Sequence, residues 1–149
     1  MRAVVQRAHR ARVEVGGEVT GAIERGLVVF VAAGEGDTDA DVAYMVGKVV
    51  GLRVFPDAQG KMRHAVGEVG GGLLVVSQFT LYGDVRRGNR PSFDGAMEPV
   101  GAERLYERFV GEARGRGVMV ATGRFRAEMT VFVENDGPVT VLIDSKKVV

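Results

Sequence analysis

Short runs of apolar and β-branched residues are the main pattern of this chain, and they predict strands. They alternate with polar positions or cluster Val, Ile and Leu, and glycine or polar residues bound them. The runs lie at residues 3–7, 12–15, 19–23, 27–33, 73–76, 129–133 and 139–143. Gly16-Gly17 is a two-residue hairpin signal. Asn135-Asp136-Gly137-Pro138 joins the last two runs, where a simple hairpin turn is the plain interpretation.

Two segments instead show the helical period. Thr38 with Asp41 three residues later forms a capping box, and apolar residues follow at positions 42, 45, 46, 49 and 50. A second helix is predicted over residues 102–113, with Leu105, Tyr106, Phe109 and Val110 on one face. Strands and helices in this irregular order predict an α+β fold. We expect a single β-rich domain over residues 1–149, with a mostly antiparallel sheet and two main helices.

The composition is that of a soluble globular protein, with 46% hydrophobic and 26% charged residues. No apolar run approaches the roughly 20 residues of a membrane span, so we expect no membrane partner. The chain has no cysteine, which excludes disulfides and a thiolate nucleophile and agrees with a cytoplasmic location. Scarce asparagine and cysteine fit heat adaptation, whereas the excess of arginine over lysine fits codon bias in a GC-rich genome equally well. A net charge of +1 means that an anionic partner must be held by a local basic patch.

The sequence lacks the motifs of several common catalytic and metal-binding sites. His9 and His64 are the only histidines, and no nucleophile-elbow, HExxH or phosphate-loop motif occurs. Asp37, Asp39 and Asp41 resemble the start of a calcium loop, but Val42 stands where that loop needs glycine. These carboxylates suit a helix N-terminus better. We therefore predict no metal and no cofactor.

Three features are not explained by packing alone. Polar residues follow a buried strand at 77–84, where a strand that simply surfaces and turns is the competing interpretation. The Gly137-Pro138 bond can be cis at modest cost. Basic residues gather near aromatic ones, which suits phosphates and stacked bases, although solvated surface charge explains them equally well. These basic residues are Lys61, Arg63, His64, Arg86, Arg87, Arg90, Arg124 and Arg126.

At these positions the sequence resembles the D-aminoacyl-tRNA deacylase family, and the likeness covers nearly the whole chain. Seven strings in the family order carry it. They are Val5-Gln6-Arg7-Ala8, Gly17-Glu18-Val19-Thr20-Gly21, Phe55 to Met62, Ser77-Gln78-Phe79-Thr80-Leu81, Arg90-Pro91-Ser92-Phe93, Thr122-Gly123-Arg124-Phe125 and Asn135 to Thr140. The sequence departs from many relatives at Arg63, followed by His64, and at Arg126, where small residues are common.

The resemblance implies a homodimer that acts on aminoacyl-tRNA, with two active sites at the subunit interface. Ser77, Gln78, Phe79 and Thr80 would line the pocket of one subunit, and Gly137 and Pro138 would enter it from the other. Arg7 would orient that inserted motif, and Phe125 and Met129 would lie near the terminal adenosine. Two carbonyl oxygens of a cis Gly-Pro unit would clash with an L-side chain and admit D-residues and glycine, so mischarged glycyl-tRNA is an expected second substrate.

The chemical step has two interpretations. Thr80 is the obvious hydroxyl nucleophile, but no neighbouring base is evident to activate it. Alternatively, the 2′-hydroxyl of the terminal ribose assists, and the protein supplies positioning and an oxyanion site at the Phe79 or Thr80 amide. We favour the second, because the sequence is poor in general bases.

Two other functions use the same residues. A catalytically silent RNA-binding module would need the basic and aromatic side chains but no turnover. A further hypothesis is an editing domain that works beside a synthetase. We expect a chain that is self-contained from Met1, which argues mildly against it.

Overall fold

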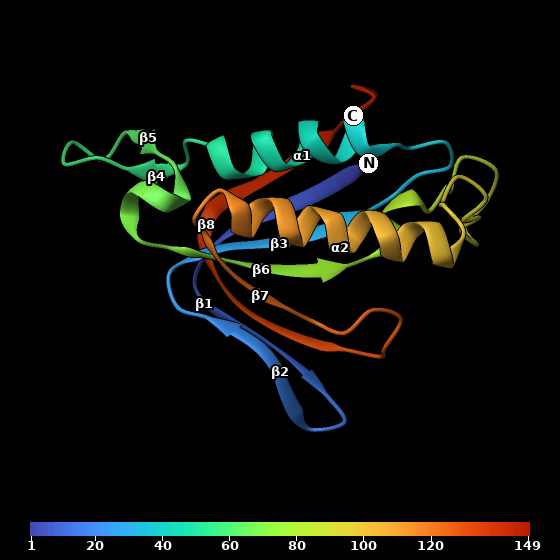
Figure 1. The fold of residues 1–149 in the computed structure, drawn as a ribbon, viewed down its shortest axis with the longest axis horizontal. Coiled ribbons are helices and arrows are strands. Elements are labelled where there is room, and N and C mark those ends of the chain that lie inside the picture. Colours follow the sequence, from blue (N-terminus) through green and yellow to red (C-terminus); the bar gives the residue numbers. More distant parts are fainter.

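The computed structural model describes all 149 residues. Its main feature is one six-stranded sheet in the order β2-β1-β3-β6-β7, with β8 on the other edge of β1 (Figure 1). These strands are β1 (Arg2–Val15), β2 (Glu18–Ile23), β3 (Gly26–Ala32), β6 (Gly72–Ser77), β7 (Met119–Thr122) and β8 (Thr130–Asp144). A small separate hairpin is formed by β4 (Phe55–Pro56) and β5 (Met62–His64).

Both long helices cover the same face of this sheet, side by side (Figure 1). Helix α1 (Asp39–Gly51) lies between β3 and β6 in the chain, and α2 (Pro99–Gly115) lies between β6 and β7. The strands on either side of each helix are parallel, so each helix is a crossover connection. The fold is α+β as predicted, and the remaining strand pairs are antiparallel.

Both predicted helices are confirmed. They could be predicted because their signals are local in the sequence. Thr38 caps α1, its hydroxyl accepting from the Ala40 amide while Asp41 Oδ2 accepts from the Thr38 amide at 2.8 Å. Helix α2 begins three residues earlier than predicted, at Pro99, with the Glu98 carboxylate accepting from the Val100 and Gly101 amides. The apolar faces of both helices join the larger of two cores, between helices and sheet.

The second core lies on the opposite face, where β1 changes partner. The first half of β1 pairs with β3 and the second half with β2, while β8 follows the whole length of its other edge. Seven buried residues pack there, and they are Ala8, Ala11, Val13, Ile23, Val28, Leu74 and Val76. Residues 3–7 and 12–15 therefore form one strand rather than two.

The predicted hairpin at Asn135 to Pro138 is wrong. Thr140 pairs with Gln6 and Asn135 pairs with Ala8, so residues on both sides of this segment belong to one strand, β8. Residues 136–139 loop out of the ladder opposite Arg7 instead of turning the chain back. The sequence also did not predict β4, β5, β7 or the two 3₁₀ helices η1 (Val66–Val69) and η2 (Phe79–Tyr82).

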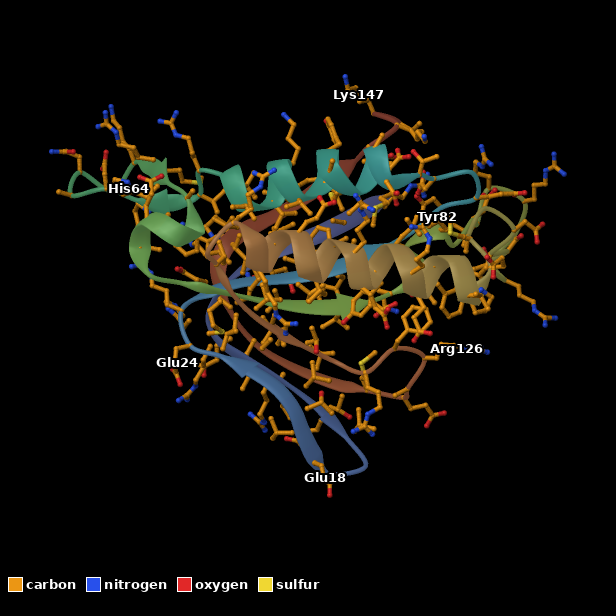
Figure 2. All side chains as sticks on the ribbon, viewed as in Figure 1. Glu18, Glu24, His64, Tyr82, Arg126 and Lys147 are labelled. Atoms are coloured by element: carbon orange, nitrogen blue, oxygen red, sulfur yellow. The ribbon has the colours of Figure 1, made fainter.

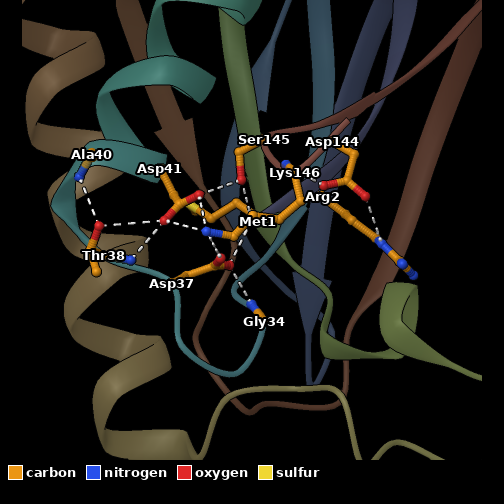
Figure 3. Close-up of polar contacts among 10 residues, drawn as sticks. All are labelled: Met1, Arg2, Gly34, Asp37, Thr38, Ala40, Asp41, Asp144, Ser145 and Lys146. Carbon is orange, nitrogen blue, oxygen red and sulfur yellow. Dashed lines mark hydrogen bonds and ion pairs between the residues drawn. The ribbon is translucent and has the colours of Figure 1, made fainter. Parts of the chain in front are cut away.

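A buried polar network ties the start of α1 to both chain ends (Figure 3). The amino group of Met1 lies 2.6 Å from Asp37 Oδ2 and donates to the Ser145 hydroxyl, which in turn donates to Asp41 Oδ1 at 2.7 Å. Lys146 Nζ lies 3.0 Å from Asp41 Oδ1. The aspartates thus serve the helix start and its ion pairs. No helix is both long enough and apolar enough to cross a membrane.

Candidate functional site

A cavity of about 680 Å³ opens where the parallel strands β3 and β6 end. Ligands in open α/β sheets bind at the carboxyl ends of parallel strands, so the topology favours this place. The start of α2 and the loop between β7 and β8 form its other walls. Fourteen of its 19 lining residues are hydrophobic. The complete lining consists of Met1, Val31, Ala32, Ala33, Ser77, Gln78, Phe79, Phe93, Ala96, Met97, Pro99, Ala102, Tyr106, Phe125, Arg126, Ala127, Glu128, Met129 and Val131.

The segment after β6 leaves the sheet at the cavity. The Gln78 amide donates to the Val31 carbonyl at 2.9 Å, and the chain then enters η2 at Phe79. The first amides of a helix have no partner within the helix, and no side chain caps η2. Phe79 is 56% exposed, and its ring packs edge-on against Phe93, with 5.2 Å between ring centroids. This strand end therefore presents free N–H groups beside an aromatic surface.

Thr80 stands just outside the cavity lining. It is exposed, and its hydroxyl accepts a hydrogen bond from Gln78 Nε2 at 2.6 Å. No carboxylate or imidazole contacts it: His9 lies beside Asp136 and His64 beside Glu68. The single carboxylate in the cavity lining is that of Glu128. The protein places no base against the Thr80 hydroxyl.

Two tyrosines frame the site without serving as bases. The Tyr106 hydroxyl donates to the Val75 carbonyl at 3.1 Å, and burial raises the pKa of Tyr106 to about 12. Burial, together with the Asp37 and Asp144 carboxylates, raises the pKa of Tyr82 far above its usual range. Tyr82 also supports the guanidinium of Arg2, which donates to the Leu81 carbonyl at 3.2 Å and so holds η2 in place.

Arg7, Gly137 and Pro138 form a second group. The Gly137-Pro138 bond is cis, and both residues are exposed. The buried Arg7 guanidinium holds the loop: its Nε lies 2.9 Å from Asp136 Oδ2, and its Nη1 donates to the Val54 carbonyl at 2.5 Å. A Cβ added to Gly137 would meet only Asn135 Nδ2, at 3.6 Å. Packing within this chain therefore does not require glycine at position 137.

The two groups are separate within one chain. Arg7 pairs with Leu27 at the start of β3, whereas Ala3 pairs with Val31 at the cavity. The run of β1 between Ala3 and Arg7 spans roughly 13 Å at about 3.3 Å per residue. The structure thus brings Ser77, Gln78, Phe79, Phe125 and Met129 together, leaves Thr80 at the edge, and places Arg7, Gly137 and Pro138 elsewhere.

Several residues of the site carry no sequence signal for their role. Tyr106 belongs to the apolar face of its helix and Phe93 to a motif, but neither pattern predicts a place in the cavity wall. Met1, Ala96 and Met97 show no pattern at all that indicates the cavity. Of the basic residues after β6, Arg86 forms an ion pair with Asp84 at 2.7 Å, which lowers the pKa of that carboxylate to about 2. No cluster of three potential metal ligands occurs.

Comparison with known proteins assigns the chain to a family. The family model described as D-Tyr-tRNA(Tyr) deacylase matches residues 4–144. A D-aminoacyl-tRNA deacylase of Sorangium cellulosum is 70% identical over 148 residues, 99% of each chain, and that of Symbiobacterium thermophilum is 57% identical over 99% of this chain and 97% of its own. The solved structure titled c-Myc DNA Unwinding Element Binding Protein is 42% identical, with a TM-score of 0.91 over 97% of this chain and 98% of that one. The chain belongs to the D-Tyr-tRNA(Tyr) deacylase family.

Proposed function

We propose that this protein hydrolyses the ester bond between a D-amino acid and the 3′ end of tRNA. One observation carries the proposal: five residues matched to the family's pocket, Ser77, Gln78, Phe79, Phe125 and Met129, line one largely apolar cavity in a member of that family. Its size lies within the range of small-molecule sites. The substrate belongs to the translation machinery, so the proposal places the protein in the cytoplasm.

In this proposal the aminoacylated end of the substrate occupies the cavity, whose lining includes Phe125 and Met129. An adenine ring can pack between Phe125 and Met129, and the ester then lies toward the end of β6. The uncapped amides at the start of η2 are donors for the oxyanion that forms when the ester carbonyl is attacked. Such donors act on the transition state rather than on the substrate, which is how they accelerate the reaction.

Handedness is read, in this proposal, by a second copy of the chain. The loop at Gly137 and Pro138 lies outside its own cavity, is exposed, and is held by the Arg7–Asp136 ion pair. Inserted into the cavity of a partner subunit, its backbone would exclude an L-side chain and admit a D-side chain or glycine. A glycine that packing does not require is expected where a foreign surface comes close.

In this proposal the attacking group is a water molecule and not a residue of this chain: water adds to the ester carbonyl, and the bond between the acyl group and the ribose oxygen breaks. Thr80 Oγ1 is bonded to the Gln78 amide and contacts no base. The 2′-hydroxyl of the terminal ribose is adjacent to the ester in the substrate itself, so orientation alone can make it assist the attack. The protein then supplies binding, orientation and the oxyanion donors.

The test is the rate of hydrolysis of D- and L-tyrosyl-tRNA by purified protein. We expect the D-ester to be cleaved and the L-ester to persist, with glycyl-tRNA also cleaved. Equal rates on the two enantiomers would overturn the chiral part of the proposal. A silent RNA-binding module would bind both substrates in a salt-dependent way and cleave neither.

A further inference from the structure

Arg126 occupies a backbone position suited to glycine. The Ala127 amide donates to the Arg124 carbonyl at 3.2 Å, which closes a turn with Phe125 and Arg126 at its centre. Arg126 has φ 63°, whereas Phe125 is not left-handed. A positive φ at the third position of a turn is the type II arrangement, which favours glycine or asparagine. An arginine here adopts a less favourable backbone conformation, so a role for its side chain is expected.

The turn around Arg126 is firmly anchored, so the backbone that carries the Arg126 side chain is held in place. Phe125 packs on Tyr106, with 5.8 Å between ring centroids. The Gly123 amide donates to the Val75 carbonyl at 3.2 Å, and a Cβ on Gly123 would come within 2.6 Å of Met129 Sδ. The loop therefore lies tightly against β6 and the cavity wall.

The Arg126 side chain itself has no partner within the chain. It lines the cavity, is exposed, and forms no hydrogen bond or ion pair. Figure 2 shows it at the outer end of the loop between β7 and β8, directed away from the sheet. Eight of the other fifteen arginines form ion pairs, for example Arg86 with Asp84 and Arg104 with Asp39. A free cation at the mouth of the cavity is available to a ligand.

We propose that Arg126 binds the phosphodiester that precedes the terminal adenosine of the substrate. This inference rests on the proposed function, since it assumes that the adenosine occupies the cavity beside Phe125. The chain of nucleotides must then leave through the mouth, where Arg126 stands. Its guanidinium presents several donors in a planar fork that matches a phosphate group. It also offsets the repulsion between that phosphate and Glu128, the one carboxylate of the lining.

The test compares two substrates, D-tyrosyl-tRNA and D-tyrosyl-adenosine, of which the second has no phosphate. Arg126→Gly should raise the KM for the tRNA about three- to tenfold with kcat little changed. It should also lower the slope of log KM against the logarithm of the salt concentration by about 0.7, the value for one phosphate of a single strand. The KM for the adenosine ester should change far less.

Two further variants serve as controls. Arg126→Lys keeps the positive charge and should keep most of the affinity for the tRNA. Arg124→Gln removes a charge from the same loop that is outside the cavity lining, and it should have a smaller effect than Arg126→Gly.

Stability separates a binding role from a structural one. Glycine suits the turn, so Arg126→Gly should unfold at the same temperature as the wild type or higher. An equal rise in KM on both substrates, or no rise on the tRNA, would overturn the inference while leaving the proposed function intact. A wild-type protein that cleaves neither D-ester would overturn the proposed function and this inference with it.

Discussion

The Arg7 guanidinium on β1 and the Asp136 carboxylate on β8 lie 2.9 Å apart, and this ion pair holds the looped-out residues 136–139. Arg7 is only 9% exposed and also donates to the Val54 carbonyl. If the Asp136 carboxylate moved away, the buried Arg7 guanidinium would keep its charge without a counter-charge, which is strongly unfavourable. The two side chains therefore stay together. The position of Gly137 and Pro138 follows from this pairing.

Removal of the Asp136 carboxylate should therefore affect both stability and activity. We expect Asp136→Ala to lower the free energy of unfolding by about 1.5–3 kcal/mol, because a hydrogen-bonded charge loses its partner. Hydrolysis of D-tyrosyl-tRNA should fall at least tenfold if, as proposed, this loop enters a partner's cavity, because the loop is then no longer oriented. Urea unfolding and initial rates measure the two effects.

The same strand offers the control for that variant. Glu134 forms an exposed ion pair with Arg10, and both side chains are more than half exposed. Exposed pairs contribute about 0–1 kcal/mol, so Glu134→Ala should change stability little. If Glu134→Ala and Asp136→Ala were equally destabilising, the Arg7–Asp136 pair would have no special role.

The contacts of Thr80 predict a modest effect of its removal. Thr80→Ala loses one hydrogen bond from Gln78 at an exposed position and should keep the fold and much of the activity. A substrate whose terminal ribose lacks the 2′-hydroxyl should be nearly inert with wild type and variant alike. An inactive Thr80→Ala enzyme and a deoxy substrate cleaved normally would instead make Thr80 the nucleophile.

Glu128 is the one carboxylate in the cavity lining, so whether it acts as a base also needs a test. In the ribose-assisted reaction it does not act as a base. Glu128→Gln should then retain the wild-type dependence of kcat on pH. Loss of a rising limb in that profile would assign proton transfer to Glu128.

The sequence predicted those parts of the fold whose signals are local. The Thr38 cap and the apolar stripe that follows it lie within one helix, so their spacing alone indicates the element. The 14-residue length of β1 was missed because polar and small residues interrupt its middle, where pairing with β8 maintains the strand. Strand pairing is decided by distant residues that a local pattern does not contain.

The candidate site divides in the same way. Ser77 and Gln78 stood out as polar residues at a strand end, and the structure places them on the cavity. Their partners Met1 and Tyr106 come from the chain start and from α2, which only the folded topology brings near. The looped-out Gly137 was expected in a turn, since an opposite strand that continues past it leaves no mark in the local sequence.

Acid should weaken the fold through Asp41. Burial alone would raise the pKa of Asp41, but hydrogen bonds from Thr38, Ser145 and Lys146 outweigh it and lower the pKa well below the usual range. A carboxyl whose folded pKa is depressed contributes stability above its unfolded pKa of about 3.9, and this is lost as pH falls toward the folded value. The urea midpoint should therefore begin to drop below about pH 5 and should continue to drop below about pH 3, toward the folded pKa. Asp41→Asn, less stable at neutral pH, should show a smaller drop. An unchanged drop in Asp41→Asn would assign the acid sensitivity to other groups.

The separation of the loop at Gly137 from the cavity of its own chain predicts complementation between two inactive variants. Gly137→Trp places a large side chain on an exposed loop with open space around it, so it should fold and yet block the cavity that the loop enters. Ala127→Trp fills the cavity from its own wall, where Ala127 is half-buried. Each variant alone should be inactive, since both sites of its symmetric dimer carry the lesion.

Mixing the two variants and allowing their subunits to exchange gives the decisive measurement. If loop and cavity come from different chains, as proposed, one site of a heterodimer receives both substitutions and the other receives neither. Activity should return to about half the wild-type value per heterodimer, as each dimer then has one intact site. If loop and cavity worked within one chain, every site in the mixture would keep one lesion and no activity would return. Differently tagged subunits, purified through both tags, establish that exchange has occurred. Inactive heterodimers isolated in this way would show that Gly137 does not serve the cavity of a partner.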